Sequence, residues 1–258
     1  GRQGPGPGPA ASALVVAMAG LLLSGGAALW QRQSNARQVD RLLATEVAAL
    51  ADRLERRLLI AEHGLRAARS IVLASGGPDR LPFSVYQSID SLEREYPGVR
   101  GFGLVRRVPA VAGTDTRYVV QFMDPPAGNA HLVQADLHAD PLLRPLADSA
   151  ATAGQVLAGP PRPLPGGDME IIALLGLRLP GSSDSSWVLG SLSGTRMLRD
   201  LTAANGPQAL RVRDLDSGTV FGPSPWPAAC GAPAQVDRFV FGRRWQVATC
   251  ADAAYRAA

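Results

Sequence analysis

Hydrophobic and polar positions divide the chain into an uncharged beginning, a long amphipathic segment and a remainder rich in short apolar runs. Residues 10–30 carry no charge, and as a helix rising about 1.5 Å per residue they reach roughly 30 Å, the thickness of a bilayer core. This length predicts a membrane-spanning helix with Trp30 at the interface. The alternative is a signal peptide with residues 14–23 as its apolar stretch. Residues 1–9 are rich in glycine and proline and are expected to be disordered.

Residues 34–75 repeat apolar side chains every three or four positions, the spacing of one face of an α-helix. The repeat consists of Val39, Leu43, Val47, Leu50, Leu54, Leu58, Ala61, Leu65, Ala68 and Val72. The pattern predicts a stalk helix that continues from the membrane span and ends where glycine and proline follow at 76–78. Its apolar stripe can pack on the chain's own domains or form a parallel dimer seam, and both can hold on different parts of the helix.

Beyond the stalk, short apolar runs bounded by turn residues predict two small antiparallel sheets. The first sheet and its helices are expected at 83–96, 99–108, 118–123, 140–154, 155–158, 170–179, 186–193 and 195–204. The second is expected at 210–215, 219–221, 236–241 and 244–250. The fold class is therefore α+β, with a long N-terminal transmembrane and stalk helix followed by domains at 83–204 and 208–250.

Composition narrows the classes of partner. Apolar residues make up 46% of the chain, enough for a buried core. All 26 basic residues are arginines, the net charge is only +4, and aromatic residues are 5%. Nucleic-acid binding needs a clustered basic surface or stacking aromatics, and because the arginines are scattered, no nucleic-acid partner is expected.

The two cysteines, Cys230 and Cys250, can form one disulfide in an oxidising compartment, with two buried thiols as the alternative. Arginines that follow residues 10–30 favour a cytoplasmic stalk by the positive-inside rule, but long domains translocate largely regardless of charge. The cysteines favour the opposite side. The expected location is the inner cell membrane, crossed once, with the folded part periplasmic or extracellular.

Residues 96–109 read YPGVRGFGLVRRVP, which resembles the signature of the CHASE sensor family. In that signature, a helix ends at Tyr-Pro-Gly-Val and enters a Gly-x-Gly strand that finishes in Val-Pro. Residues 136–154, 170–180 and 241–247 resemble further blocks of the family in the same order, so the resemblance covers roughly residues 35–250. It implies an extracellular sensor, as in cytokinin-receptor-like histidine kinases of bacteria, plants and slime moulds. Its two domains would be PAS-like, and the membrane-distal one would bind a small ligand.

The resemblance also implies where a ligand binds. In plant cytokinin receptors, an aspartate on the Asp-Pro helix and a threonine on the proline-ended strand belong to the site. The matching positions here are Leu143 and Arg178, and loss of the carboxylate removes a strong, charge-assisted hydrogen bond. Arg178 is the lone charge in the run from 171 to 179 and could hold a ligand carboxylate or phosphate. An internal salt bridge or a solvent-facing strand end are the alternatives.

Four further side chains are candidates because they alternate along two predicted strands. Phe102 and Leu104 should share one strand face, as should Tyr118 and Phe122 on theirs, and either pair could line a pocket. A plain hydrophobic core is the alternative interpretation of all four.

No catalytic or metal-binding pattern is recognisable. Asp136, His138 and Asp140 alternate near His131, but their context fits loop and helix-cap residues better than a metal site. Hydrolase and nucleotide-loop motifs are missing from the sequence, so no cofactor, metal or enzymatic activity is expected in this segment.

The sequence thus predicts an extracytoplasmic small-ligand-sensing module of a membrane receptor. Its signal would pass through the stalk and membrane helices to a histidine kinase or diguanylate cyclase domain downstream. Expected partners are a small molecule, anionic if Arg178 binds it, the membrane, and a second copy of the chain through the stalk. The alternative is a membrane-anchored dimerisation or protein-interaction module without a small ligand.

Overall fold

The computed structural model describes residues 9–75, 89–110, 115–178, 185–201, 209–222, 230 and 233–250. The chain forms two units, Gly1–Thr45 and Glu46–Ala258. The described part of the first unit is helical and belongs to α1, Pro9–Ala74. The predicted disorder at residues 1–9 falls, except for residue 9, outside the described residues.

A membrane crossing needs about 20 consecutive, predominantly apolar helical residues. The described helices include none that meets this requirement. This finding contradicts the predicted span at residues 10–30 and the single-span inner-membrane location inferred from it.

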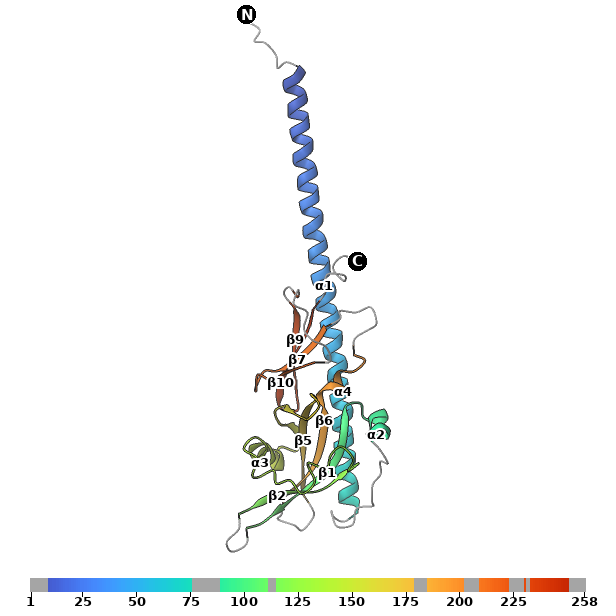
Figure 1. The fold of residues 1–258 in the computed structure, drawn as a ribbon, viewed down its shortest axis with the longest axis vertical. Helices are drawn as coiled ribbons and strands as arrows, with labels where there is room; N and C mark the ends of the chain where they lie inside the picture. Colours follow the sequence, from blue (N-terminus) through green and yellow to red (C-terminus); the bar gives the residue numbers. More distant parts are fainter. Residues whose placement is uncertain are drawn as a thin grey trace, which may run out of the picture. The chain divides into compact units, whose positions relative to one another are not determined.

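The larger sheet of the second unit, sheet A, is antiparallel, with the strand order β2-β1-β6-β5-β3 and with β4 also paired to β5 (Figure 1). Its strands are β1 Val99–Val108, β2 Arg117–Asp124, β3 Leu157–Ala158, β4 Arg162–Pro163, β5 Met169–Arg178 and β6 Ser185–Ser193. The predicted strands match these to within one or two residues, apart from β4, which was not predicted. Residues 111–114 and 179–184 lie outside the described residues.

The smaller sheet, sheet B, is also antiparallel, in the order β8-β7-β10-β9. Its strands are β7 Ala209–Asp214, β8 Val220–Phe221, β9 Ala234–Val240 and β10 Arg243–Cys250. The predicted α+β class with two antiparallel sheets is confirmed. The domain boundaries at 83–204 and 208–250, and the PAS-like character of the domains, stay predictions.

Within the described ranges, three short helices accompany the sheets: α2 Ile89–Glu95, α3 Leu143–Ala153 and α4 Gly194–Leu198. The helix expected from 140 is regular only from Leu143, but Asp140 makes the contacts of a helix cap: its carboxylate accepts the backbone N–H groups of Leu142 and Leu143 at 2.9 and 3.2 Å, and its carbonyl accepts that of Arg144 at 2.9 Å. The helix expected at 195–204 ends early, because Arg199 has an extended backbone.

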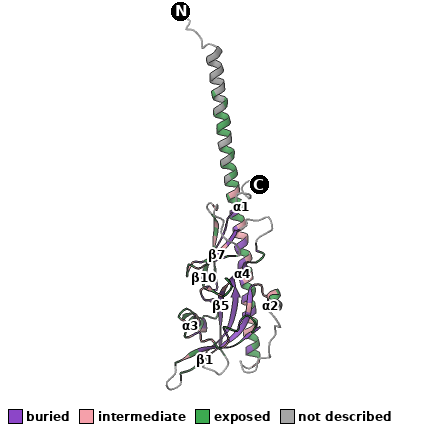
Figure 2. Cartoon of the chain, in the orientation of Figure 1, coloured by how far each residue is buried: buried purple, intermediate pink, exposed green. Residues whose placement is uncertain are grey.

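Sheet A carries a hydrophobic core on each face, because successive side chains of a strand point to opposite sides. Along β5, Ile171, Ala173 and Leu175 join the core that contains α1, whereas Ile172 and Leu174 join the core that contains α3. Figure 1 shows α1 and α3 on the two sides of this sheet. Both faces of the central strands are therefore buried (Figure 2).

The α1 core extends from sheet A to sheet B. Leu50, Leu54 and Leu58 of α1 belong to one buried cluster with Val212 and Trp245 of sheet B. A backbone hydrogen bond of 2.8 Å from Ala158 N to Phe241 O joins the ends of the two sheets directly. The second unit is thus one body in which both sheets share the same helix.

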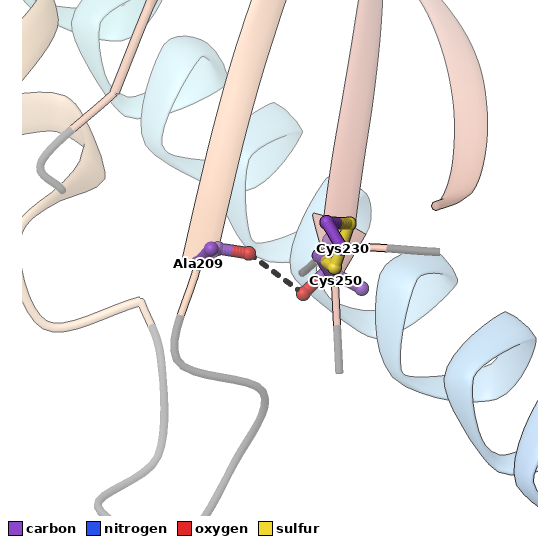
Figure 3. The surroundings of a disulfide bond; sticks show 4 residues. Ala209, Cys230 and Cys250 are labelled. Atoms are coloured by element: carbon purple, nitrogen blue, oxygen red, sulfur yellow. Dashed lines mark hydrogen bonds between the residues drawn. A yellow bond between two sulfur atoms is a disulfide. The ribbon is translucent and has the colours of Figure 1, made fainter. Parts of the chain in front are cut away.

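A disulfide joins Cys230 to Cys250 at the end of β10 (Figure 3). Beside it, the Thr249 hydroxyl donates to the Ala209 carbonyl of β7 at 2.9 Å. The bond ties the chain ahead of β9 to the last residue of β10, and thereby closes one end of sheet B.

Gly64 marks a close approach of α1 to sheet A. A Cβ at this position would overlap the ring of Phe102 and would lie 2.8 Å from the Tyr96 ring. These two aromatic rings pack edge to face, with their centroids 5.3 Å apart. We therefore expect Gly64→Ala to lower the free energy of unfolding by about 1–2 kcal/mol in urea denaturation, because overpacking outweighs the gain in helix propensity.

The matched control is Gly25→Ala, also in α1, where a new Cβ meets nothing within 4 Å. This variant should leave the unfolding midpoint unchanged or higher. If Gly64→Ala stabilised the protein as much as Gly25→Ala, the close packing of α1 on Phe102 would be disproved.

Candidate functional site

Glu170, near the start of β5, is a carboxylate with only 1% of its surface exposed. Its Oε1 accepts the Ser191 hydroxyl at 2.8 Å and lies 3.1 Å from Nε2 of His131. Its Oε2 accepts Nη2 of Arg162 at 2.9 Å. Because burying an unpaired charge is costly, these partners are what allow the carboxylate to lie inside the fold. Glu170, Arg162, His131 and Ser191 are called the Glu170 cluster below.

Strand register brings the cluster together. Glu170 lies on the same face of β5 as Ile172, the face covered by α3. Ser191 of β6 is directly opposite Ile172, and Arg162 of β4 is directly opposite Glu170. His131 comes from the turn region that follows β2. The cluster therefore unites four segments that are far apart in the sequence.

The accessible side of the cluster is basic. Glu170 and Ser191 are buried, whereas the Arg162 side chain is 24% exposed and that of His131 is 42% exposed. Arg162 also donates to Asp140 at 3.0 Å, which links the cluster to the turn that precedes α3. A molecule that approaches from solvent therefore meets a guanidinium and an imidazole before it reaches the carboxylate.

Two buried polar atoms beside the cluster have no hydrogen-bond partner in the described part of the chain. Asn129 is 0% exposed and donates to the carbonyls of Arg100 and Pro125 at 2.8 and 2.9 Å, but its Oδ1 accepts nothing. Nε of Arg100 is likewise without a partner. Asn129 lies against Gly101, which is opposite Ser191 across β1 and β6. Such atoms are ordinarily satisfied by water or by a bound molecule.

Asp168, two residues before Glu170, holds the beginning of α4. It accepts the Ser193 hydroxyl at 2.6 Å and the backbone N–H groups of Met169 and Thr195 at 2.7 and 3.0 Å. Burial alone would raise the pKa of Asp168, but these hydrogen bonds outweigh burial and the pKa is lowered. The carboxylate is therefore charged at neutral pH and fixes α4 to the ends of β5 and β6.

The other end of α4 is held by α1. Nη1 of Arg57 donates to the carbonyls of Met197 and Arg199 at 2.9 and 2.6 Å, and Nη1 of Arg53 donates to the Leu201 carbonyl at 2.8 Å. Burial lowers the pKa of Arg57, and neighbouring carboxylates partly oppose this effect. Two arginines of α1 thus bind the same short segment that Asp168 caps.

Two of the predicted ligand residues, Leu143 and Tyr118, lie in the core beneath α3. The Tyr118 hydroxyl donates to Asp148 of α3 at 2.6 Å, and its ring is 4.8 Å from that of Trp187. Burial, together with the nearby Asp148 carboxylate, raises the pKa of Tyr118. Leu143 itself is 1% exposed.

The other four predicted residues lie elsewhere. Phe102 and Leu104 point to the α1 side of sheet A, Phe122 is 36% exposed, and Arg178 is exposed at the end of β5. Arg178 forms no ion pair with any described residue. The structure therefore brings Leu143 and Tyr118 into one core and places Leu104 directly opposite Phe122 across β1 and β2, but it does not unite the six residues. A ligand-binding role for the six residues stays a prediction.

Sequence analysis missed the Glu170 cluster although one signal for it was present. A lone charge in an apolar strand drew attention to Arg178, and Glu170 gives the same signal at the opposite end of β5. Arg162 lies among prolines and offered no such signal.

The predicted loop role of Asp136 matches the structure. Its carboxylate accepts the backbone N–H groups of Tyr118 and His138 at 2.8 and 3.0 Å, and Arg117 donates to it at 3.2 Å. Burial alone would raise the pKa of Asp136, but these hydrogen bonds and the charge of Arg117 outweigh burial, so the pKa is lowered. Within the described ranges, no group of three His, Cys, Asp or Glu side chains could hold a metal ion.

Comparisons with known proteins gave structural likenesses only. No family model and no curated protein matches the sequence. An extracellular ligand-binding receptor from Desulfohalobium retbaense has a TM-score of 0.49 and 12% identity, over 83% of this chain and 39% of that one. The ligand-binding domain of the Pseudomonas aeruginosa amino acid chemoreceptor PctC, in complex with GABA, has a TM-score of 0.45 and 13% identity. The likeness covers 84% of this chain and 99% of that one.

A third likeness is the sensory domain of the Campylobacter jejuni chemoreceptor Tlp3 with isoleucine bound. Its TM-score is 0.40 and its identity 8%, over 88% of this chain and 97% of that one. This chain spans well under half of the first structure, the Desulfohalobium receptor. The first of these proteins is an extracellular ligand-binding receptor, the second a ligand-binding domain and the third a sensory domain. Likenesses this distant establish neither the function nor the ligand of this chain.

Glu170→Gln keeps the shape of the buried side chain and removes its charge. We expect this variant to lower the free energy of unfolding by about 2–4 kcal/mol in urea, because Arg162 then loses its buried counter-charge. The control is Arg244→Gln, which breaks an ion pair of 3.2 Å whose arginine is 62% exposed and should cost less than about 1 kcal/mol. Equal effects of the two variants would show that the Glu170 cluster is not a buried ionic network.

Proposed function

We propose that this chain is a small-ligand-sensing module whose ligand binds on the α3 side of sheet A, at the Glu170 cluster. One observation carries the proposal: strands β5 and β6 hold a buried polar network on one face and pack on α1 with the other. A sheet of this kind can translate a change in the contacts of Glu170 into a change in its packing against a long helix.

The chemistry of the cluster suits a small polar ligand. Arg162 and His131 face solvent and can contact an acidic or hydrogen-bonding group. The unpartnered Oδ1 of Asn129 can accept an N–H or O–H from the same molecule. Binding would exchange some of the contacts of Arg162 with Glu170 and Asp140 for contacts with the ligand.

A short chain of contacts leads from the cluster to α1. On β5, Glu170 is two residues from Asp168. On β6, its partner Ser191 is two residues from Ser193. Asp168 and Ser193 hydrogen-bond each other and together hold the first turn of α4. Arg57 of α1 binds the carbonyls at the end of α4. A ligand that prefers one arrangement of these contacts would shift the population between two positions of α1.

Several finer features belong to the same proposal. The module works outside the cytoplasm, which the Cys230–Cys250 disulfide supports because disulfides persist in oxidising compartments. Its two sheets are PAS-like domains of a CHASE-type sensor, as the resemblance of residues 96–109 implies. The segment is itself non-enzymatic and regulates a histidine kinase or diguanylate cyclase domain of the full-length protein.

The test is a thermal-shift screen of small polar molecules against the chain. A true ligand should stabilise the protein in a saturable manner, by about 2.7 kcal/mol at one hundred times its dissociation constant. Arg162→Gln should abolish this stabilisation. Arg144→Gln, which removes an exposed arginine of α3, should leave it intact. A ligand whose effect survives Arg162→Gln would place the site elsewhere, and the absence of any ligand in a broad screen would contradict the proposal.

A second candidate function, dimerisation through α1, is favoured by a row of exposed aliphatic side chains. Leu59, Ile60, Ile71 and Leu73 of α1 are 38–44% exposed. Ile60 and Ile71 lie on one helix face, three turns apart. Such a stripe can pair with the same stripe of a second copy around a two-fold axis.

We expect sedimentation equilibrium to show a reversible dimer that Ile60→Asp weakens by at least about tenfold, because a charge in an apolar helix seam is left unpaired. Arg56→Asp changes a polar exposed residue one turn away and is the charge control. A monomer at all concentrations, or equal weakening by both variants, would exclude the helix seam.

A further inference from the structure

Sheet B has a hollow on the face that points away from α1. Its volume is about 170 Å³. The side chains that line it come from all four strands of the sheet and include Arg211, Arg213, Val220, Gln235, Gln246 and Ala248. The opposite face carries the buried side chains of Val212, Trp245 and Val247. The hollow is thus separate from the Glu170 cluster, which belongs to sheet A.

Strand register explains why the surface is hollowed. In one row across the sheet, Ala248 lies between Arg211 of β7 and Gln235 of β9. A methyl group between two long side chains leaves a depression with an apolar floor. In the next row, Arg213 lies between Val220 and Gln246. The walls are therefore two guanidinium groups on one side and two side-chain amides on the other.

The charge of the hollow is positive. Arg211 and Arg213 point to the same side of β7 because they are two residues apart. No carboxylate lines the hollow among the described residues. The acid nearest in register is Asp237, which is opposite Gln246 and accepts a hydrogen bond of 3.2 Å from its amide. Arg213 is exposed and makes no ion pair within the described ranges, so its guanidinium is available to an anion.

We propose that this hollow binds a small organic anion, a monocarboxylate with a short apolar tail. The carboxylate binds the guanidinium group of Arg213, whose planar donors match its two oxygens, and Arg211 lies beside it on the same side of β7. The tail lies on the methyl group of Ala248. Gln246 supplies a further amide at the edge.

The disulfide shapes one wall of this site. Pro233, which also lines the hollow, follows Cys230 by three residues, and Ala248 of the floor precedes Cys250 by two. The Cys230–Cys250 bond therefore holds the segment that leads into β9 against the end of β10. Reduction of the bond should loosen this wall and weaken the anion site without touching its arginines.

The test is isothermal titration of the full chain with butyrate, and with the neutral isostere butyramide at the same ionic strength. Butyrate should bind with a single site and butyramide at least about tenfold more weakly, because a charge-assisted hydrogen-bond pair is worth at least that factor. Arg213→Gln should weaken butyrate about tenfold or more on the same grounds. Arg244→Gln removes an exposed arginine of the same sheet that does not line the hollow, and should change the affinity less than about twofold.

Ala248→Val provides a second, uncharged test. It fills the floor with a residue that suits a strand and should abolish butyrate binding while the thermal unfolding midpoint stays near that of the wild type. The proposal is overturned if butyrate does not bind, if butyramide binds equally well, or if Arg244→Gln and Arg213→Gln weaken binding alike. It is also overturned if butyrate still binds Ala248→Val with full affinity. None of these outcomes bears on the Glu170 cluster.

Discussion

Burial of the apolar stripe of α1 is the interaction on which the rest of the second unit depends. Leu50, Leu58 and Leu65 are at most 3% exposed, and they belong to one core with residues of both sheets. Each such side chain contributes about 1.5–3 kcal/mol by leaving water. Sheet A has a second core beneath α3, but sheet B has only this one among the described elements. The two sheets also meet directly, through the hydrogen bond between Ala158 and Phe241 and the close approach of Gly242 to Leu157.

Double coverage of sheet A sets a strict condition for any polar group inside it. A strand buried on both faces reads as a nearly continuous apolar run, as β5 does from Ile171 to Leu177. A charge can enter such a strand only near an end, where other segments supply partners. Glu170 does so at the end next to α4, and Arg178 reaches solvent at the opposite end. The position of the candidate site therefore follows from where the sheet can tolerate a buried carboxylate.

These conditions also explain what the sequence could and could not predict. The stripe of α1 and the strand at 99–108 follow from local periodicity, and both were found. The membrane span at residues 10–30 rested on length and lack of charge alone, and the described helices do not support it. The Glu170 cluster joins residues 131, 162, 170 and 191, whose proximity depends on strand order and register. No local pattern encodes that proximity. The sequence therefore drew attention to Arg178, a lone charge in an apolar run, but not to Arg162.

The energetics of the Glu170 cluster bear on its purpose. A buried ion pair adds little net stability, because desolvation offsets much of the attraction, and apolar residues of similar volume would serve the fold as well. The cluster nevertheless gathers a carboxylate, a guanidinium, an imidazole and a hydroxyl from four segments, beside an amide oxygen with no partner in the described chain. It lies two residues from the contacts that bind α4 to α1. An arrangement that the core does not require, placed where it can act on the helix that holds both sheets, is what the proposed ligand-sensing role needs.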